Sequence, residues 1–168
     1  MTHKWYNKEK AIDKDRVEIN GDYIKNYKNP SEKLQLIAVQ ENGLSIRFIK
    51  NPTKKVKYKA VENHEAAIGW IDNPSKELQL YAIKHSILAL QWIKNPYYCV
   101  KYNAILQDCY AIKYLQSLED ELQLLALQYC HNKDKKDIYN FIIHFYTRDN
   151  EERFNHQVKK LKLKYGPF

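Results

Sequence analysis

The stretch Asn73-Pro74-Ser75-Lys76-Glu77-Leu78-Gln79-Leu80-Tyr81-Ala82 is one copy of a phrase that recurs along most of the chain. Asn-Pro pairs begin four copies, at residues 29, 51, 73 and 95, so each copy starts 22 residues after the last. The alanine of the phrase keeps the same spacing, at residues 38, 60, 82, 104 and 126. A fixed period of this kind is typical of repeat proteins, whose units bury their apolar faces only against their neighbours. The period therefore predicts five stacked units over residues 25–134.

Each unit is expected to contain two short helices. An Asn-Pro pair favours a helix start, because the Asn side chain can accept from free N–H groups and Pro suits the first helical position. In the third unit this predicts a helix over residues 73–84, with Leu78, Ala82 and Ile83 facing inward, and a shorter one over 87–94. The fold class expected is all-α, a right-handed α-solenoid of about five two-helix repeats.

The two ends of the chain differ from the repeats. Asn20-Gly21 matches Asn42-Gly43 one period later, which indicates that residues 1–24 form a degenerate repeat acting as an N-terminal cap. Apolar residues over 138–145 follow a helical i, i+3, i+4, i+7 pattern. Residues 135–168 are therefore expected to form a C-terminal helical cap and a basic tail, after the repeats of residues 25–134.

The three residues before the repeated alanine alternate between Leu-Gln-Leu and Val-Lys-Tyr, so a double unit of 44 residues overlies the single one. The middle residue of each trio lies between inward-facing neighbours. We expect these middle residues to form one exposed row: Gln35, Lys57, Gln79, Lys101 and Gln123.

Composition narrows the class of protein. The 168 residues carry a net charge of +8 with 29% charged side chains, which fits a folded, soluble chain. No apolar run is long enough to span a bilayer, and the first residues lack a secretory signal. Three cysteines without C-x-x-C spacing favour reduced thiols in the cytoplasm. We expect a cytoplasmic protein with no membrane contact.

No pattern of catalytic or metal-ligating residues stands out. The chain contains no G-x-S-x-G, Walker or G-x-G-x-x-G motif. Cys109 and Cys130-His131 recur about one period apart, but their spacing matches no known set of metal ligands. We therefore expect no enzyme activity, no metal and no cofactor.

An aromatic side chain occupies one position in four successive units, as Phe48, Trp70, Trp92 and Tyr114. Each is followed by Ile or Leu. The rings either fill the core between stacked units or form a ribbon on one face, on which a partner protein docks or nucleic-acid bases stack.

Positive charge is concentrated in two places, and both are candidate phosphate contacts. One cluster lies in the second unit and consists of Arg47, Lys50, Lys54, Lys55, Lys57 and Lys59. The other lies in the tail and consists of Lys159, Lys160, Lys162 and Lys164. These clusters carry the alternative reading of the chain as a nucleic-acid-binding protein.

Residues 25–134 resemble a group of short helical repeats found in proteins of bacteriophages, bacteria and large DNA viruses. The match is close at Asn29-Pro30-Ser31-Glu32 and over residues 34–39 and 73–80. These repeats are similar to HEAT and leucine-rich-variant repeats. The resemblance implies an all-α interaction module, which fits a phage-encoded inhibitor of a host defence protein. It carries no catalytic residues.

The first hypothesis is thus a non-enzymatic helical-repeat scaffold that binds a macromolecule, with a protein favoured over nucleic acid. Its expected contact residues are Lys57, Tyr81, Lys101, Trp70 and Trp92. The sequence leaves the oligomeric state open.

Overall fold

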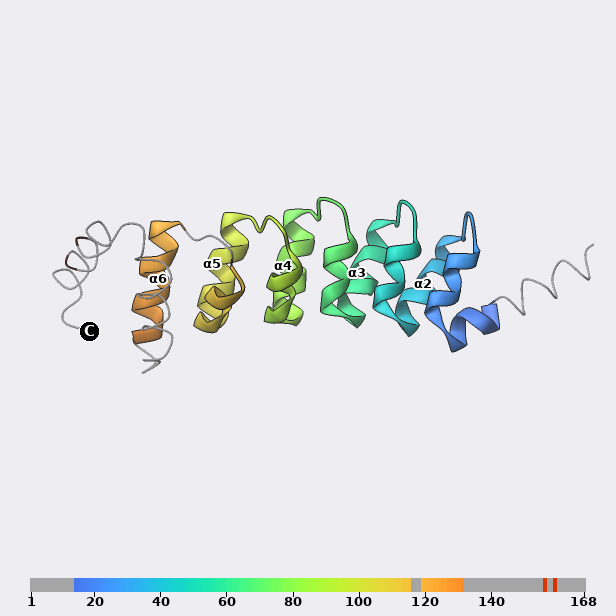
Figure 1. Ribbon diagram of the computed structural model, residues 1–168, viewed down its shortest axis with the longest axis horizontal. Helices are drawn as coiled ribbons and strands as arrows, with labels where there is room; N and C mark the ends of the chain where they lie inside the picture. Colours follow the sequence, from blue (N-terminus) through green and yellow to red (C-terminus); the bar gives the residue numbers. More distant parts are fainter. Residues whose placement is uncertain (1–13, 116–118, 132–155, 157–158, 160–168) are drawn as a thin grey trace, which may run out of the picture. The chain divides into compact units, whose positions relative to one another are not determined.

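The computed structural model describes residues 14–115, 119–131, 156 and 159 (Figure 1). Every regular element among these residues is a helix, and they contain no strand. The predicted all-α class is therefore confirmed. No helix in this part of the chain is both long enough and apolar enough to cross a membrane.

The helices fall into two compact units, Met1–Asn95 and Pro96–Phe168. The α-helices of the first unit are α2 (Glu32–Glu41), α3 (Lys54–Asn63) and α4 (Lys76–His85), and those of the second are α5 (Tyr98–Gln107) and α6 (Asp120–His131). Short 3-10 helices lie between them: η1 (Gly21–Asn26), η2 (Gly43–Phe48), η3 (Glu65–Trp70), η4 (Ile87–Trp92) and η5 (Cys109–Tyr114). Residues 14–19 are also helical. The boundary between these two compact units lies between Asn95 and Pro96, inside the fourth Asn-Pro pair. The repeat pattern does not predict a boundary at this point.

The elements keep the period of the sequence. From α2 to α5 each α-helix has ten residues and begins 22 residues after the previous one, and the six-residue 3-10 helices follow the same spacing. Within the first unit, α2 packs on α3 and α3 on α4, while η1 to η4 pack in the same order. Figure 1 shows α2, α3 and α4 side by side in chain order. In the second unit α5 packs on α6.

The helices do not begin at the Asn-Pro pairs, so that prediction is wrong. The N-cap is the Ser or Thr after the proline: Ser31, Thr53 and Ser75 each accept from the backbone N–H three residues on. The asparagine instead makes the preceding turn. Asn51 has φ 52° and Asn73 has φ 46°, a left-handed conformation that Asn tolerates better than most residues.

One extended residue joins each α-helix to the 3-10 helix that follows it. These joint residues are Asn42, His64, Ser86 and Asp108, with φ between −143° and −151°. The N–H of each donates to the carbonyl of the repeated alanine at 2.9 Å. Except in Ser86, the side chain of the joint residue also accepts from the N–H two residues later, and so caps the 3-10 helix.

The core contains the residues that the sequence predicts on the inward face of α4. Leu78, Ala82 and Ile83 are at most 2% exposed, which confirms the inward face predicted for α4. The repeated alanines are buried in every unit, and so are the Ile and Leu residues that follow the 3-10 helices. The space around the alanine backbone is tight, because a Cβ on Gly43 would lie 2.5 Å from the carbonyl oxygen of Ala60.

The row expected to be exposed is largely buried, so that prediction is also wrong. Gln35, Gln79, Lys101 and Gln123 are at most 9% exposed, and Lys57 is half-buried. The physical reason is visible at Gln79, whose Nε2 donates to the carbonyl of Pro74 at 3.0 Å and to that of Asn95 at 3.4 Å. Gln35 Nε2 donates in the same way to Pro30, at 2.9 Å. The amide turns back over the start of its own helix and satisfies the proline turn there.

Several expectations lie outside the described residues. They are the cap formed by the first residues, the replacement of the fifth Asn-Pro pair at residues 117–118, the helix over 138–145, and Lys160, Lys162 and Lys164. Lys159 is described as helical and exposed.

Gly43→Ala is predicted to lower the free energy of unfolding by about 1–3 kcal/mol, the usual cost of overpacking. The added Cβ would meet the backbone of Ala60 and also approach Asn63 Oδ1, which accepts from the Gly43 N–H at 2.7 Å. Urea denaturation of the two proteins measures the difference.

Gly69→Ala is the matched control, since its Cβ would approach Trp92 no closer than 3.3 Å. It should cost clearly less than Gly43→Ala. Equal losses at the two glycines would contradict the close approach at Ala60.

Candidate functional site

The two tryptophans of the aromatic series lie on the surface. Trp70 is 58% exposed and Trp92 is 45% exposed, while Phe48 and Tyr114 are half-buried. The core position belongs to the next residue in each unit: Ile49, Ile71, Ile93 and Leu115 are each 6% exposed. Of the two alternatives left open by the sequence, the core reading is therefore wrong for Trp70 and Trp92.

The two exposed rings come from adjacent elements. Trp70 ends η3 and Trp92 ends η4, and these 3-10 helices pack on one another. A Cβ on Gly69 would lie 3.4 Å from the Cβ of Trp92, so the backbone before Trp70 passes beside Trp92. One unit earlier Arg47 replaces this glycine, and its guanidinium lies 4.6 Å from the ring centroid of Phe48. We call Trp70 and Trp92 the tryptophan pair.

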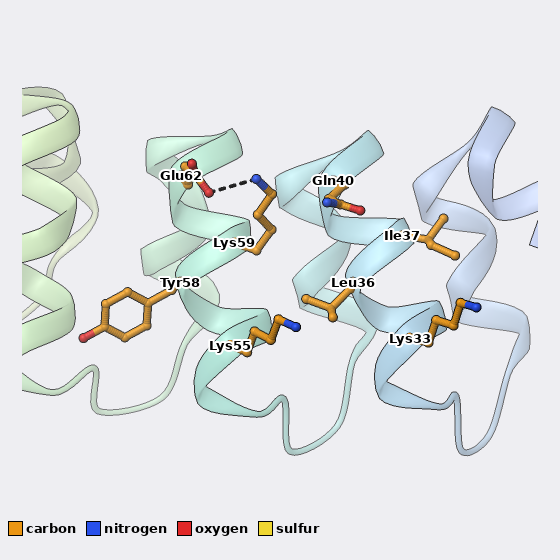
Figure 2. A pocket seen from close by; sticks show the side chains of 8 residues that line it. All are labelled: Lys33, Leu36, Ile37, Gln40, Lys55, Tyr58, Lys59 and Glu62. Carbon is orange, nitrogen blue, oxygen red and sulfur yellow. Dashed lines mark hydrogen bonds and ion pairs between the residues drawn. The ribbon is translucent and has the colours of Figure 1, made fainter.

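A groove of about 560 Å³ lies along α2 and α3 (Figure 2). Each helix lines it with the same i, i+3, i+4, i+7 stripe, and the two stripes are one period apart. The stripe of α2 is Lys33, Leu36, Ile37 and Gln40, and that of α3 is Lys55, Tyr58, Lys59 and Glu62. Figure 2 shows Leu36 and Lys55 pointing toward one another between the helices. We call this the α2–α3 groove.

The charge of the groove is uneven along its length. Lys59 Nζ pairs with Glu62 at 3.0 Å near the helix ends. At the other end Lys33 and Lys55 occupy the second position of their helices, and neither forms an ion pair with any residue that the structure describes. The end formed by the helix starts therefore carries the free positive charge, and the positive ends of two helix dipoles add to it.

Tyr58 is part of the lining, but its ring packs against α4. Figure 2 shows this ring pointing toward α4, where its centroid lies 4.8 Å from that of Tyr81. Tyr81 also lies 4.1 Å from the ring of His85. Three rings thus pack on the α4 side of α3, whereas on its α2 side the side chain of Leu36 points toward α3.

The expected basic cluster of the second unit does not form one free patch. Arg47 donates to Asp22 at 2.5 Å, and Lys54 lies 5.6 Å from the ring of Tyr58. Lys57 is half-buried and Lys50 is exposed, while Lys55 and Lys59 line the α2–α3 groove. Part of this charge is therefore already engaged within the protein.

Among the expected contact residues, Lys101 belongs to the interior. Its Nζ donates to Glu119 Oε1 at 2.9 Å, and its side chain is 9% exposed. Burial acts to raise the pKa of the Glu119 carboxyl. The hydrogen bond from Lys101, the backbone N–H of Glu119 and the ammonium charge outweigh burial, so the pKa lies below its usual value. Lys101 holds the start of α6 and is not part of an open surface.

Sequence reasoning missed most of the α2–α3 groove. It named Lys55 and Lys59 as candidate phosphate contacts but did not connect them with Lys33, Leu36 or Ile37. The available signal was the lysine at residues 33 and 55, one period apart and on the same stripe. For metals, the described residues contain no group of three or more His, Cys, Asp or Glu that could hold an ion.

Comparison with known proteins gives no relative: no protein-family model, no curated protein and no solved structure matches the chain.

Glu119→Gln is predicted to destabilise the protein at pH 7, by about 0.5–1 kcal/mol, because solvent reaches the half-exposed Glu119 carboxylate and screens its pairing with Lys101. A carboxyl whose pKa is lowered by folding stabilises the protein above its usual value of about 4.5, and this contribution is lost as the pH falls through the lowered pKa.

The difference between wild type and Glu119→Gln should therefore shrink progressively as the pH falls below 4.5, the usual pKa of this carboxyl. Denaturation at pH 7 and at a series of pH values below 4.5 measures it. A difference that stays constant over this range would show that the ion pair with Lys101 does not stabilise the fold.

Proposed function

We propose that this chain is a non-enzymatic scaffold of helical repeats that binds a partner protein through the tryptophan pair. In this proposal the repeats stack as a right-handed α-solenoid of about five two-helix units, with residues 1–24 and 135–168 capping its ends.

Hydrogen bonds between neighbouring repeats support the solenoid. Asp22 Oδ1 accepts from Asn42 at 3.0 Å and from the Ser45 hydroxyl at 2.7 Å, in the next unit. Asn63 reaches back to the previous unit, where its Nδ2 donates to the carbonyl of Gln40 at 2.9 Å. Contacts about one period apart are what a linear stack requires, because each unit touches only its neighbours.

The observation that carries the binding function is the exposure of Trp70 and Trp92 on adjacent 3-10 helices. Tryptophan is enriched among the few residues that dominate protein interfaces, where a large ring is buried against the partner. In these two repeats the buried positions are filled by Ile71 and Ile93, the residues that follow the tryptophans.

A protein partner is favoured over nucleic acid by the state of the basic cluster. Arg47 pairs with Asp22 and Lys59 with Glu62, so two of its cations already have carboxylate partners. Duplex DNA binding depends on many cations that are free to neutralise phosphates.

Trp70→Ala/Trp92→Ala is predicted to weaken partner binding by at least about 30-fold, since hot-spot residues contribute 2 kcal/mol or more. The tagged wild type is first used to capture partners from bacterial lysate, with half of the lysate treated with nuclease. A stoichiometric protein that survives nuclease is then purified, and its affinity for both forms is measured by calorimetry.

Tyr102→Ala is the matched control, because it removes an exposed aromatic ring (39%) from an α-helix instead of the 3-10 row. It should bind like wild type. Capture that disappears with nuclease, or a partner that binds the tryptophan variant equally well, would contradict the proposal.

A further inference from the structure

We infer that the α2–α3 groove binds an acidic amphipathic segment of a protein. Apolar side chains of that segment would contact Leu36 and Ile37, and its carboxylates would pair with Lys33 and Lys55. The inference rests on the proposed protein-binding function, but it concerns a different surface from the tryptophan pair.

The size and lining of the groove suit a peptide. Its volume of about 560 Å³ accommodates several side chains, and it runs along two ten-residue helices. Each helix is about 15 Å long, so the groove matches roughly three turns of a bound helix. Leu36 and Ile37 are only half-buried by the protein itself, which leaves apolar area for a partner.

Charge decides which kind of segment fits. Three lysines line the groove against one carboxylate, and Glu62 already pairs with Lys59. Lys33 and Lys55 lie at the helix starts, where the helix dipoles also favour negative charge. Glu32, a carboxylate next to Lys33, is not part of the lining and accepts from the Thr53 hydroxyl at 2.5 Å. An acidic segment complements this end of the groove, and a basic one would be repelled.

The groove is specific to α2 and α3 and is not a general consequence of the repeat. One period after Lys33 and Lys55 stands Glu77, which reverses the charge on α4. The space corresponding to the groove on the α4 side of α3 is occupied by the packed rings of Tyr58 and Tyr81. Half-buried apolar side chains beside lysines that have no ion pair with a described residue are therefore found at α2 and α3, and α4 does not repeat this combination at the corresponding positions.

A peptide fits better than nucleic acid. Leu36 and Ile37 offer apolar contact that phosphates cannot use, and the lining supplies just two lysines, Lys33 and Lys55, that have no ion pair with a described residue. Tyr58, the aromatic ring of the lining, packs on Tyr81 and is not free as a platform for a base.

The test selects ligands from a displayed library of random peptides of about 16 residues, using the full chain as bait. We expect enriched sequences to be acidic and amphipathic. The most enriched peptide is then synthesised with a fluorescent label, and its affinity is measured by anisotropy. Lys33→Glu/Lys55→Glu should weaken its binding at least about tenfold, because two attractive pairs become repulsive.

Lys76→Glu/Lys84→Glu is the matched control, since it makes the same change in net charge on exposed positions of α4. It should bind the peptide like wild type, as should Trp70→Ala/Trp92→Ala. Circular dichroism checks that each variant is folded, and Lys33→Gln/Lys55→Gln replaces the charge reversal if that variant is not.

The groove assignment is overturned by enriched peptides without acidic bias, by a library that yields no enrichment, or by a groove variant that binds like wild type. Peptides that depend on the tryptophan pair instead would overturn the groove assignment while leaving the proposed function intact. A single-stranded or duplex oligonucleotide that binds wild type, and loses affinity in Lys33→Glu/Lys55→Glu, would reassign the groove to nucleic acid.

Discussion

The repeated architecture depends on a single extended residue between each α-helix and the 3-10 helix after it. Asn42, His64, Ser86 and Asp108 all donate their N–H to the carbonyl of the repeated alanine. This bond ends one helix, and in three of the four cases the side chain of the same residue caps the next. A one-residue joint leaves little conformational freedom, so the two helices of each unit meet in nearly the same geometry every time.

The constant geometry of the joint determines where variable residues come to lie. Stripes of successive α-helices fall in register, so residues 22 apart become neighbours across the α2–α3 groove. The last residues of successive 3-10 helices likewise fall in one row, which brings Trp70 beside Trp92. A fixed backbone with changing side chains on exposed positions is how repeat proteins present different binding surfaces. Here Lys33 and Lys55 on one stripe, and two tryptophans on another row, are departures from the repeat that the core does not require.

The sequence was sufficient for the period, the all-α class and the buried face of α4, since these depend on local pattern. It was not sufficient for features that depend on tertiary contacts, such as the exact helix starts and the burial of polar side chains. Asn73 suits a helix cap and a left-handed turn equally well, and the available Ser75 takes the cap. Gln79 is polar, and its side chain was expected to be exposed to solvent. It is buried because the side-chain amide of Gln79 donates to the carbonyl of Pro74 in the turn before its helix. The ring of Tyr58, part of the groove lining, packs on Tyr81, a contact that periodicity does not predict.

The most direct test of the repeat account is the removal of one whole period, residues 54–75, compared with removal of residues 54–64. The longer deletion joins Thr53 to Lys76, so a threonine N-cap again precedes an α-helix, and every later joint keeps its place. We predict that this variant, although less stable, unfolds cooperatively and keeps the helical signal per residue of the wild type in far-ultraviolet circular dichroism. The shorter deletion breaks the period and should lose both properties. If the two deletions are equally disruptive, the 22-residue period is not the structural unit of this protein.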